Sequence, residues 1–476
     1  MEISKHKTLH FIGIGGAGMS AIATVALEMG YSVTGSDLKE SISTIRLKDL
    51  GAKIFFGNKP ANLREADVVI VSTAIPDDNP EYAHAKQEKM VILRRAEMLD
   101  VLMRHFQRRI SVAGTHGKTT TSSMVAKALM DNGKKPTYLV GADLRDLGGN
   151  AGLGTSDYFV AESDESDGSF LYLHPNVGII TNIETDHLDY YKDFDNIKFH
   201  FQKFMQGIRD RQGYLIINRD DPVLVELAKP FEEHVIYYGI HTKAEVMATK
   251  IVHTPEGSNF TLKINGRDKG EVYLQVYGQH NVSNCLSVIA LGIKENISLE
   301  GIKKSLFGFS GAKRRFQWIG QENGIDVYDD YGHHPTEIYT TLDGAKRSFP
   351  ERRVICIFQP HRYTRTRDLL ESFPDAFQAA DMTIITEVYS ANEEKIAKIS
   401  GRLIVDKVKA KFAAEARFIA KKSDIPKTLV PLLRPGDLVI TMGAGDIHTV
   451  AKELVAQLKT AVPKSPVLPS PNAGPV

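Results

Sequence analysis

V-A-G-T-H-G-K-T-T-T, at residues 112–121, lies between an apolar segment and a segment with helical periodicity. Residues 109–113 have the length and apolar character of a short buried strand, and residues 119–132 place apolar side chains on one helical face before Gly133. Glycines between a strand and a helix let backbone N–H groups point at an anion, and the helix N-terminus adds positive potential. The stretch therefore predicts a loop that binds nucleotide phosphates.

The side chains of this loop suit the same chemistry. Lys118 is expected to hold the outer phosphates, and the Thr119 hydroxyl is expected to bind magnesium. The loop is a variant of the usual pattern. In that pattern the first glycine lies farther before the glycine of G-K-T, whereas here Gly114 lies closer to Gly117. A plain glycine turn before a helix is the alternative, but it does not explain the order of strand, G-K-T and helix.

Length and composition restrict the class of protein. A chain of 476 residues predicts about three domains, and 59 basic against 58 acidic residues give no reason to expect nucleic acid or an anionic membrane as partner. Cys285 and Cys356 stand outside any metal-binding or disulfide spacing. The first residues lack a hydrophobic signal core and no apolar run is long enough to span a membrane, so we expect a cytoplasmic protein without membrane insertion. The proline-rich residues 461–476 are expected to be a disordered tail.

A second glycine-rich turn occurs near the N-terminus, where residues 13–18 read G-I-G-G-A-G between a predicted strand and a predicted helix. In this setting the turn predicts a diphosphate at the helix N-terminus, with Asp37 at the end of the next strand on a ribose. A further predicted strand ends at Ser72, where an open parallel sheet presents ligand contacts. The motif does not identify the ligand by itself: a dinucleotide cofactor, or glycines that serve only packing, are alternatives.

Two strands predicted after the phosphate loop end in acidic clusters. Residues 158–161 run into E-S-D-E-S-D, and residues 177–181 run into N-I-E-T-D-H. Alternating strands and helices in this region predict a mainly parallel α/β sheet, whose strand ends meet at one edge. One acidic run is commonly a solvated loop, but two at strand ends favour magnesium ions that bridge phosphates.

Residues 245–275 alternate like antiparallel strands, with a turn at Asn265 and Gly266. The following G-Q-H-N-V-S-N precedes a helix predicted from Cys285. The side chains of Asn281 and Asn284 offer the donor and acceptor that an adenine edge requires, and capping of the helix is the alternative. The sequence alone leaves both interpretations open.

K-R-R-F at residues 313–316 marks a predicted domain boundary, and the strands and helices beyond it predict a third parallel α/β unit. Two of its loops are rich in reactive side chains, D-D-Y-G-H-H at 329–334 and Q-P-H-R-Y-T-R at 359–365. Arginines in such loops can clamp a carboxylate or a phosphate. No thiolate or regularly spaced third ligand accompanies His333 and His334, so we favour substrate contact over a zinc site.

Together these motifs resemble one family. In chain order they are G-T-H-G-K-T-T-T, E-S-D-E-S-D-G-S-F, N-I-E-T-D-H-L-D, G-Q-H-N-V-S-N, R-R-F, D-D-Y-G-H-H-P-T-E and F-Q-P-H-R-Y-T-R-T. They are similar to those of the ATP-dependent Mur ligases of peptidoglycan synthesis. The resemblance implies an α/β fold of three domains: a Rossmann-like UDP-sugar-binding domain at 1–107, a central P-loop ATPase with a mainly parallel sheet at 108–312, and a Rossmann-like amino-acid-binding domain at 313–460.

The resemblance also implies roles for individual residues. ATP is expected to contact Gly114, Thr115, His116, Gly117, Lys118, Thr119, Thr120, Asn281, Asn284, Arg315 and Asp330. The UDP-sugar is expected to contact Gly15, Gly16, Ala17, Gly18, Asp37 and Ser72. The amino acid and the lactyl end of the sugar are expected to contact Tyr331, His333, His361, Arg362 and Arg365. Two magnesium ions are expected on Thr119, Glu162 and His187, and catalytic roles fall to Lys118, His187, His333 and Arg365.

The N-terminal H-F-I-G-I-G-G-A-G-M-S narrows the implied activity. It is similar to that of the member which joins L-alanine to UDP-N-acetylmuramate through an acyl phosphate and a tetrahedral intermediate. The nearest alternative is the related ligase that attaches a recovered murein tripeptide, and an oxidoreductase or a non-catalytic nucleotide-binding regulator is more remote. Several relatives carry a carbamylated lysine in the central domain, a role that the sequence assigns to neither Lys198 nor Lys203. We expect a monomer or a weak homodimer.

Overall fold

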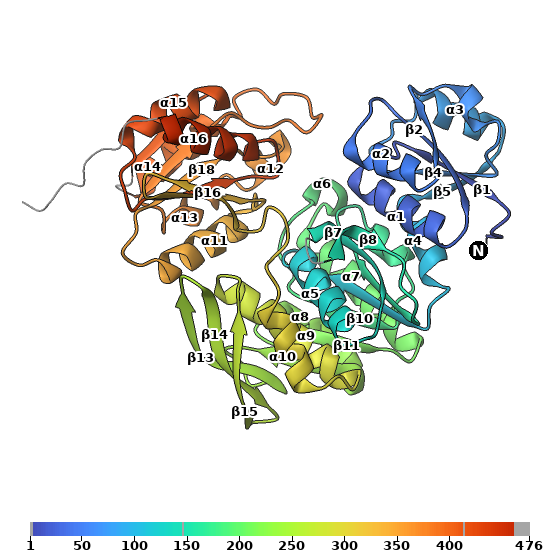
Figure 1. Ribbon diagram of the computed structural model, residues 1–476, viewed down its shortest axis with the longest axis horizontal. Coiled ribbons are helices and arrows are strands. Elements are labelled where there is room, and N and C mark those ends of the chain that lie inside the picture. The colour runs from blue at the N-terminus through green and yellow to red at the C-terminus, as the bar shows by residue number, and fades with distance from the viewer. Residues whose placement is uncertain (1–2, 145–146, 413–414, 461–476) are drawn as a thin grey trace, which may run out of the picture. The chain divides into compact units, whose positions relative to one another are not determined.

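The computed structural model describes residues 3–144, 147–412 and 415–460, and it has the predicted α/β fold with three sheets (Figure 1). The chain divides into two compact units. The first comprises Met1–Ile251, Asn259–Leu274 and Asn281–Ala312, and the second comprises Val252–Ser258, Gln275–His280 and Lys313–Val476. The first unit contains the first sheet and most of the central one, and the second contains the third sheet. The domain boundaries given above stay predictions, and the predicted tail at 461–476 lies outside the described residues.

The first sheet is parallel, with the strand order β3-β2-β1-β4-β5. Its strands are β1 (Thr8–Ile12), β2 (Ser32–Asp37), β3 (Lys53–Phe56), β4 (Val68–Val71) and β5 (Val91–Arg94). Its helices are α1 (Ala17–Glu28), α2 (Ile42–Asp49), α3 (Pro80–Gln87) and α4 (Arg95–Met103). The order reverses between β1 and β4, and ligands of open α/β sheets bind outside the carboxyl ends of the strands at such a point. The glycine turn follows β1 and Ser72 follows β4, so both predicted contacts lie at this reversal.

The central sheet has the order β15-β14-β13-β12-β11-β10-β6-β9-β7-β8. Its strands are β6 (Arg108–Ala113), β7 (Thr137–Leu144), β8 (Gly149–Gly152), β9 (Tyr158–Glu162), β10 (Val177–Ile180), β11 (Tyr214–Asn218), β12 (Val235–Gly239), β13 (Val246–Thr254), β14 (Gly257–Ile264) and β15 (Arg267–Leu274). β6 pairs in parallel with β9 on one side and β10 on the other. The phosphate loop and both acidic segments therefore leave the sheet at the same edge, and the mainly parallel character is confirmed.

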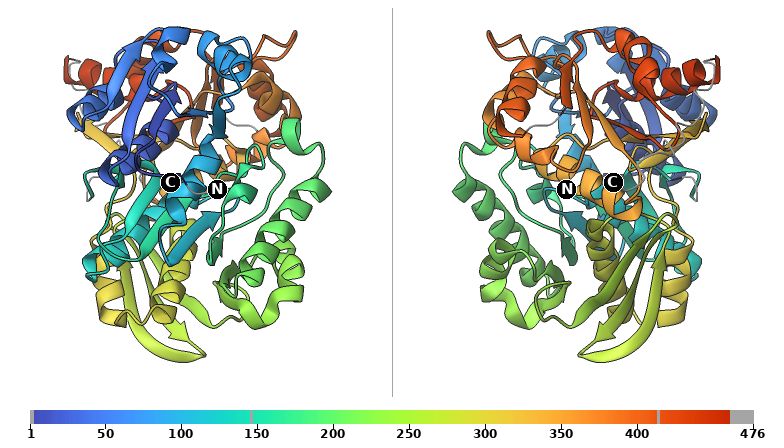
Figure 2. Two further views of the ribbon diagram at one scale, coloured as in Figure 1. Left: turned by 90° about the vertical axis from the view of Figure 1, so that its right-hand side faces the viewer. Right: turned by 90° about the vertical axis from the view of Figure 1, so that its left-hand side faces the viewer.

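Helices pack on both the sheet and one another in this domain. They are α5 (Lys118–Asp131), α6 (Leu188–Tyr191), α7 (Phe194–Asp210), α8 (Pro222–Ala228), α9 (Gln279–Lys294) and α10 (Leu299–Phe307). Phe201, Phe204 and Met205 of α7 join residues of β10 and β11 in one buried apolar cluster, and Figure 2 shows this green helix beside the central strands. α9 begins ahead of the predicted start, so Asn281 and Asn284 lie inside its first turns and neither is its N-cap.

β14 and β15 form the predicted hairpin. Asn265 and Gly266, which connect them, have φ values of +49° and +75°. Two successive residues with positive φ are typical of the type I′ turn, whose twist matches that of the flanking strands. The Asn-Gly pair thus sets the pairing of these strands locally.

The third sheet has the order β16-β17-β21-β18-β19-β20, and only β16 is antiparallel to its neighbour. Its strands are β16 (Gln317–Glu322), β17 (Ile325–Asp330), β18 (Val354–Phe358), β19 (Met382–Ile385), β20 (Glu415–Phe418) and β21 (Leu438–Met442). Its helices are α11 (Pro335–Ser348), α12 (Tyr363–Asp368), α13 (Phe373–Ala376), α14 (Gly401–Lys411), α15 (Ile425–Leu429) and α16 (His448–Thr460). β21 inserts between β17 and β18, so the loops after these three strands gather at one edge of the sheet.

Both cysteines are buried, Cys285 in α9 and Cys356 in β18. Burial raises the pKa of each thiol, because an apolar environment disfavours the thiolate. Within the described part of the chain, no helix combines the length and the apolar character that crossing a bilayer requires.

Candidate active site

The phosphate loop is held by the segment that follows β10. The backbone N–H groups of Thr115 and His116 donate to the carbonyl and the side-chain oxygen of Asn182 at 3.0 and 2.8 Å. The Asn182 amide nitrogen donates in return to the His116 carbonyl at 3.1 Å, and the Thr115 hydroxyl accepts the Glu184 N–H at 2.8 Å. Asn182 therefore fixes the path of the loop. Thr120 belongs to the first turn of α5 behind it, where backbone N–H groups lack intrahelical acceptors.

Two glycines of the loop have neighbours that leave no room for a side chain. Gly114 and Gly117 have φ values of +130° and +83°. A Cβ at Gly114 would stand 2.2 Å from the Thr181 hydroxyl oxygen, and one at Gly117 would stand 2.7 Å from the side-chain oxygen of Asn284. Asn284 in turn donates to the side-chain oxygen of Asn281 at 3.3 Å. The two segments predicted to bind one nucleotide therefore lie against each other.

Lys118 is buried at the start of α5. Its Nζ donates to two carbonyl groups of the loop at 2.7 and 3.1 Å and lies 2.8 and 2.7 Å from the carboxylate oxygens of Glu165. Burial lowers the pKa of Lys118, but the surrounding carboxylates, Glu165 first among them, outweigh burial and the net direction is upward. Burial raises the pKa of Glu165 to about 7 against the opposing effect of Lys118. The ammonium group therefore keeps its charge.

Thr119 and Glu162, two of the predicted magnesium ligands, are brought together over Gly141. A Cβ at Gly141 would stand 2.6 Å from the Thr119 hydroxyl oxygen and 2.4 Å from Oε2 of Glu162. That oxygen accepts the Gly141 N–H at 2.9 Å. Hydroxyl and carboxylate oxygens are the ligands that magnesium prefers, and glycine leaves space where any side chain would intrude. The residues present thus fit a magnesium ion.

The third predicted magnesium ligand, His187, stands immediately before α6 with a φ of +54°. Its Nε2 lies 3.6 Å from Oδ2 of Asp186, and its side chain is 18% exposed. Lys198 lies 2.5 Å from Asp195, whereas Lys203 is exposed. These contacts do not assign the carbamylated-lysine role to either lysine.

In the first domain, Asp37 binds the glycine turn itself. The Gly15 N–H donates to Oδ2 of Asp37 at 2.8 Å, and Oδ1 of Asp37 accepts the Leu38 N–H at 2.7 Å. Gly16 precedes α1, and Ala17 and Gly18 form its first turn. The ribose contact of Asp37 stays a prediction.

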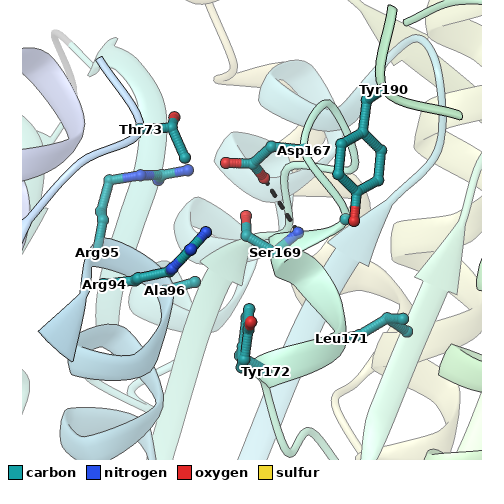
Figure 3. Close-up of a pocket in the computed structure, with 10 residues that line it drawn as sticks. Thr73, Arg94, Arg95, Ala96, Asp167, Ser169, Leu171, Tyr172 and Tyr190 are labelled. Carbon is teal, nitrogen blue, oxygen red and sulfur yellow. Dashed lines mark hydrogen bonds between the residues drawn. The ribbon is translucent and has the colours of Figure 1, made fainter. Parts of the chain in front are cut away.

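A pocket of about 240 Å³ lies close to this turn, within the first compact unit (Figure 3). Thr73, which follows Ser72, and Arg94 and Arg95 line it from the first domain, and Asp167, Ser169 and Tyr190 are among the residues from the central domain. The Arg95 guanidinium lies 3.5 Å from Asp164, and a Cβ at Gly18 would stand 3.3 Å from it. Two arginines among hydroxyl groups and aromatic rings suit an anionic sugar derivative.

In the second compact unit, the residues predicted for the substrate form one continuous cluster. The Arg315 guanidinium carbon lies 5.5 Å from the ring centre of Tyr331, and the rings of Tyr331 and His333 are 5.6 Å apart. The rings of His333 and His361 are 5.8 Å apart, and Nη1 of Arg365 lies 3.4 Å from Nδ1 of His361. The fold thus joins three segments that are distant in sequence.

Glu337, in the first turn of α11, connects this cluster to the helix. Its Oε2 accepts the His333 N–H at 3.0 Å, and its Oε1 lies 3.6 Å from the Arg315 guanidinium. His334 is buried and caps the same helix, because its Nδ1 accepts the Thr336 N–H at 3.3 Å. The adjacent histidines therefore have different contacts, and the preference for substrate contact over a zinc site stays a prediction.

Asp330 fastens the R-R-F segment to the third sheet. It is 5% exposed, and its two oxygens accept the N–H groups of Phe316 and Gly332, each at 2.7 Å. Burial raises the pKa of Asp330 to about 6 although Arg315 opposes this shift. These bonds show a positioning role, and the predicted ribose contact stays a prediction.

The turn after β18 is strained at Arg362. Its φ of 68° and ψ of 136° are open to glycine but cost other residues on the order of 1–3 kcal/mol. The Arg362 N–H donates to the Tyr389 carbonyl at 2.8 Å, and the rings of His361 and Tyr389 stack at 5.6 Å. Burial, helped by Arg365 and Arg362, lowers the pKa of His361 to about 4, so its imidazole is neutral at pH 7.

Several residues of these sites were not predicted from the sequence. Asn182 and Glu165 belong to N-I-E-T-D-H and E-S-D-E-S-D, so their position at the strand ends was a usable signal. Gly141, Arg95 and Tyr389 have no such pattern around them. Only the folded chain shows that they contact the predicted residues.

Family models match all three parts of the chain. They are described as Mur ligase family, catalytic domain, at residues 8–107; Mur ligase middle domain, at residues 112–292; and Mur ligase, glutamate ligase domain, at residues 314–445. The chain belongs to the Mur ligase family. The middle-domain model contains the phosphate loop, both acidic segments and the asparagine motif, which the fold gathers at one edge of the central sheet.

Individual relatives within the Mur ligase family match along nearly their full length. The UDP-N-acetylmuramate–L-alanine ligase of Myxococcus xanthus is 44% identical, covering 95% of each chain. That of Desulforamulus reducens is also 44% identical, covering 96% of this chain and 98% of its own. The crystal structure of the UDP-N-acetylmuramate-alanine ligase MurC from Thermotoga maritima is 31% identical with a TM-score of 0.80, covering 96% of this chain and 100% of its own. A murein peptide ligase from Psychrobacter arcticus is 26% identical with a TM-score of 0.69, covering 96% and 99%.

We expect Gly141→Ala to weaken magnesium-dependent nucleotide binding roughly ten-fold or more, because the added methyl group would displace the oxygens of Thr119 and Glu162. The measurement is a magnesium titration of nucleotide binding by calorimetry. Gly308→Ala is the matched control, since a Cβ there has its nearest neighbour at 3.6 Å and its backbone is unstrained. Equal magnesium dependence in the two variants would argue against a metal site at this position.

The lowered pKa of His361 predicts a pH-dependent stability. Between its ordinary value of 6.5 and about 4, the unfolded chain takes up a proton that the folded chain does not, so stability is lost as the pH falls through this range. His361→Gln should remove this loss, which is roughly 3 kcal/mol at most. Urea unfolding at about pH 7.5 and about pH 5 tests it. The exposed His6→Gln is the control, and an unchanged pH dependence in His361→Gln would contradict the prediction.

Proposed function

We propose that this chain joins L-alanine to the lactyl carboxylate of UDP-N-acetylmuramate, with conversion of ATP to ADP and phosphate, in the synthesis of peptidoglycan precursors. The observation that carries the proposal is the 44% identity, over nearly the whole length of both chains, to proteins of that name. The three sites support the proposal physically. The central domain has a phosphate loop with a charged lysine, the pocket beside the first glycine turn is lined by two arginines, and the second compact unit has a cluster of histidines and arginines.

The central domain would bind ATP. Lys118 keeps its charge beside the loop carbonyls, where it can hold the outer phosphates. Asn284 lies against Gly117, so a nucleotide whose phosphates occupy the loop would have an amide within reach. Thr119 and Glu162 would hold a magnesium ion, which would neutralise charge on the phosphates. A second ion on His187 is part of the proposal.

The chemistry explains why so many cations are needed. A carboxylate does not react with an amine, so its oxygen first attacks the γ-phosphorus of ATP, and ADP leaves. The alanine nitrogen then attacks the acyl carbon to give a tetrahedral intermediate, the nitrogen loses a proton, and phosphate departs with the electrons of the broken C–O bond. Both steps bring anions together, and preorganised positive groups lower the barrier most when charge develops beside them.

The pocket beside the first glycine turn would take the UDP-sugar. Arg95 touches Gly18 of the turn and Asp164 of the first acidic segment, so it connects the predicted diphosphate contacts with the neighbourhood of Lys118. Thr73 and Ser169 add hydroxyl groups, and Tyr190 adds an aromatic ring for the apolar face of a sugar.

The cluster in the second unit would take the amino acid and the lactyl end. The guanidinium groups of Arg362 and Arg365 suit carboxylates, and neutral His361 can accept a hydrogen bond near pH 7. ATP contacts by Arg315 and Asp330 are also proposed. We further propose a cytoplasmic enzyme that acts as a monomer or a weak homodimer.

The tripeptide ligase is the second candidate, because a murein peptide ligase structure shares the fold at 26% identity. The alanine ligase structure is more similar, with 31% identity and a TM-score of 0.80 against 0.69. An oxidoreductase is not favoured, since it would give no role to Lys118, Thr119 and Glu162, which the fold gathers around the phosphate loop.

We expect phosphate release that requires both UDP-N-acetylmuramate and L-alanine, measured with purified protein, ATP and magnesium. Glycine, L-serine and the tripeptide L-alanyl-γ-D-glutamyl-meso-diaminopimelate, each in a separate reaction, test selectivity. Release only with the tripeptide would transfer the proposal to the peptide ligase. No release with any acceptor would overturn the ligase function.

Lys118→Ala should abolish ligation while leaving UDP-sugar affinity within about two-fold, because the phosphate loop and the first glycine turn bind different ligands. Ligation is followed by phosphate release and affinity by calorimetry with UDP-N-acetylmuramate. Lys243→Ala, at an exposed position, is the control for loss of a positive charge. Turnover comparable to the wild type, or lost UDP-sugar affinity in a folded variant, would contradict the assignment.

A further inference from the structure

The strained turn at Arg362 is held by one carboxylate, that of Glu393. Nε of Arg362 lies 3.0 Å from Oε1 of Glu393. The same carboxylate accepts the Thr364 hydroxyl at 2.6 Å and the Thr364 backbone N–H at 3.0 Å. The Glu393 side chain is only 16% exposed. Burial raises its pKa, but the bonds from Thr364 and the charge of Arg362 outweigh burial and keep the pKa below its ordinary value. Glu393 is therefore an ionised group largely withdrawn from water.

The segment that carries Glu393 is itself joined to the strained turn. The two residues before Glu393 have φ values of +49° and +68°, so the chain turns sharply there. Just ahead of them, the Tyr389 N–H donates to the Pro360 carbonyl and the Tyr389 carbonyl accepts the Arg362 N–H, both at 2.8 Å. Backbone bonds hold one side of the strained turn, and Glu393 holds the other.

The bonds around the turn hold Arg362 in its strained conformation. A residue such as Arg362 relaxes to an ordinary conformation unless surrounding bonds over-determine its position. Relaxation would rotate the chain between His361 and Arg365, and the directions of both side chains would change. Both oxygens of Glu393 already bind protein donors, so Glu393 supports the turn and does not itself hold a substrate.

We propose that Glu393 is a positioning residue: it holds the strained backbone at Arg362 and thereby aims His361, Arg362 and Arg365 at the acceptor amino acid. The identity of that amino acid rests on the proposed function. The support that Glu393 gives to the backbone at Arg362, called the clamp below, does not depend on that function. Glu394 is the matched control, because it is the next residue, has the same side chain and is exposed.

The first experiment compares Glu393→Gln with Glu394→Gln in steady-state ligation. Loss of a charged hydrogen-bond acceptor should lower kcat/KM for L-alanine roughly 10- to 100-fold in Glu393→Gln, with the KM for ATP within about two-fold of the wild type. Glu394→Gln should match the wild type. Arg362→Ala alone and with Glu393→Gln completes the cycle. If Glu393 acts largely through Arg362, the fold-loss of kcat/KM in the double variant should be several-fold smaller than the product of the two single fold-losses.

Three outcomes of this experiment would overturn the proposal. Glu393→Gln could behave like Glu394→Gln, or it could raise the KM for ATP as much as that for L-alanine. The fold-loss of kcat/KM in the double variant could also equal the product of the losses in Glu393→Gln and Arg362→Ala. The last result would mean that Glu393 acts independently of the turn.

A second experiment needs no ligase activity and separates failure of the clamp from failure of the proposed function. Thermal melting is measured for Glu393→Gln in the Arg362→Ala and Arg362→Gly backgrounds, which both lack the guanidinium that pairs with Glu393, whereas only glycine removes the strain. The proposal predicts a clear fall in Tm in Arg362→Ala and a smaller fall in Arg362→Gly. Equal falls in both backgrounds would overturn it. Should Glu393→Gln fail to fold, Glu393→Asp, which keeps the charge but shortens the reach, takes its place in both experiments.

Discussion

The close contact of the phosphate loop with its neighbours is the constraint on which the first compact unit depends. Gly114 and Gly117 stand so near to Thr181 and Asn284 that a Cβ would overlap with either. This contact exists only because β6 lies between β9 and β10 and because α9 brings its first turns to the loop. The close packing therefore requires the sheet order, the glycines and the asparagine motif together.

Local patterns predicted much of this fold. The strand predicted at residues 109–113 is β6, the helix predicted at residues 119–132 is α5, and Asn265-Gly266 sets its hairpin by backbone preference alone. Contacts between distant segments could not be predicted in this way. Nothing near Arg95 indicates that it reaches Gly18, and nothing near Glu393 indicates Arg362, because such pairs depend on how strands are ordered in space. The start of α9 was placed too late, since the polar G-Q-H-N-V-S-N does not have an apolar helical period.

Three cations of the proposed sites share one arrangement, in which the cation lies against a carboxylate of the protein. Lys118 pairs with Glu165, Arg95 with Asp164 and Arg362 with Glu393. A carboxylate keeps a partly buried cation charged and in place, and breaking such a pair is costly. A phosphate or carboxylate of a substrate must therefore compete with a group that is already present. Observed affinity is the difference between the two interactions, which favours ligands that offer more than a single negative charge.

The burial of both thiols has a practical consequence for measuring the separation of the two compact units in solution. Thiol reagents attack the thiolate, and Cys285 and Cys356 have neither the exposure nor the acidity to form it readily. Exposed sites such as Lys243 in the first unit and Glu394 in the second could be replaced by cysteine without removing the native ones. Fluorophores attached there would report the separation of the units by resonance energy transfer, against little background from the native chain.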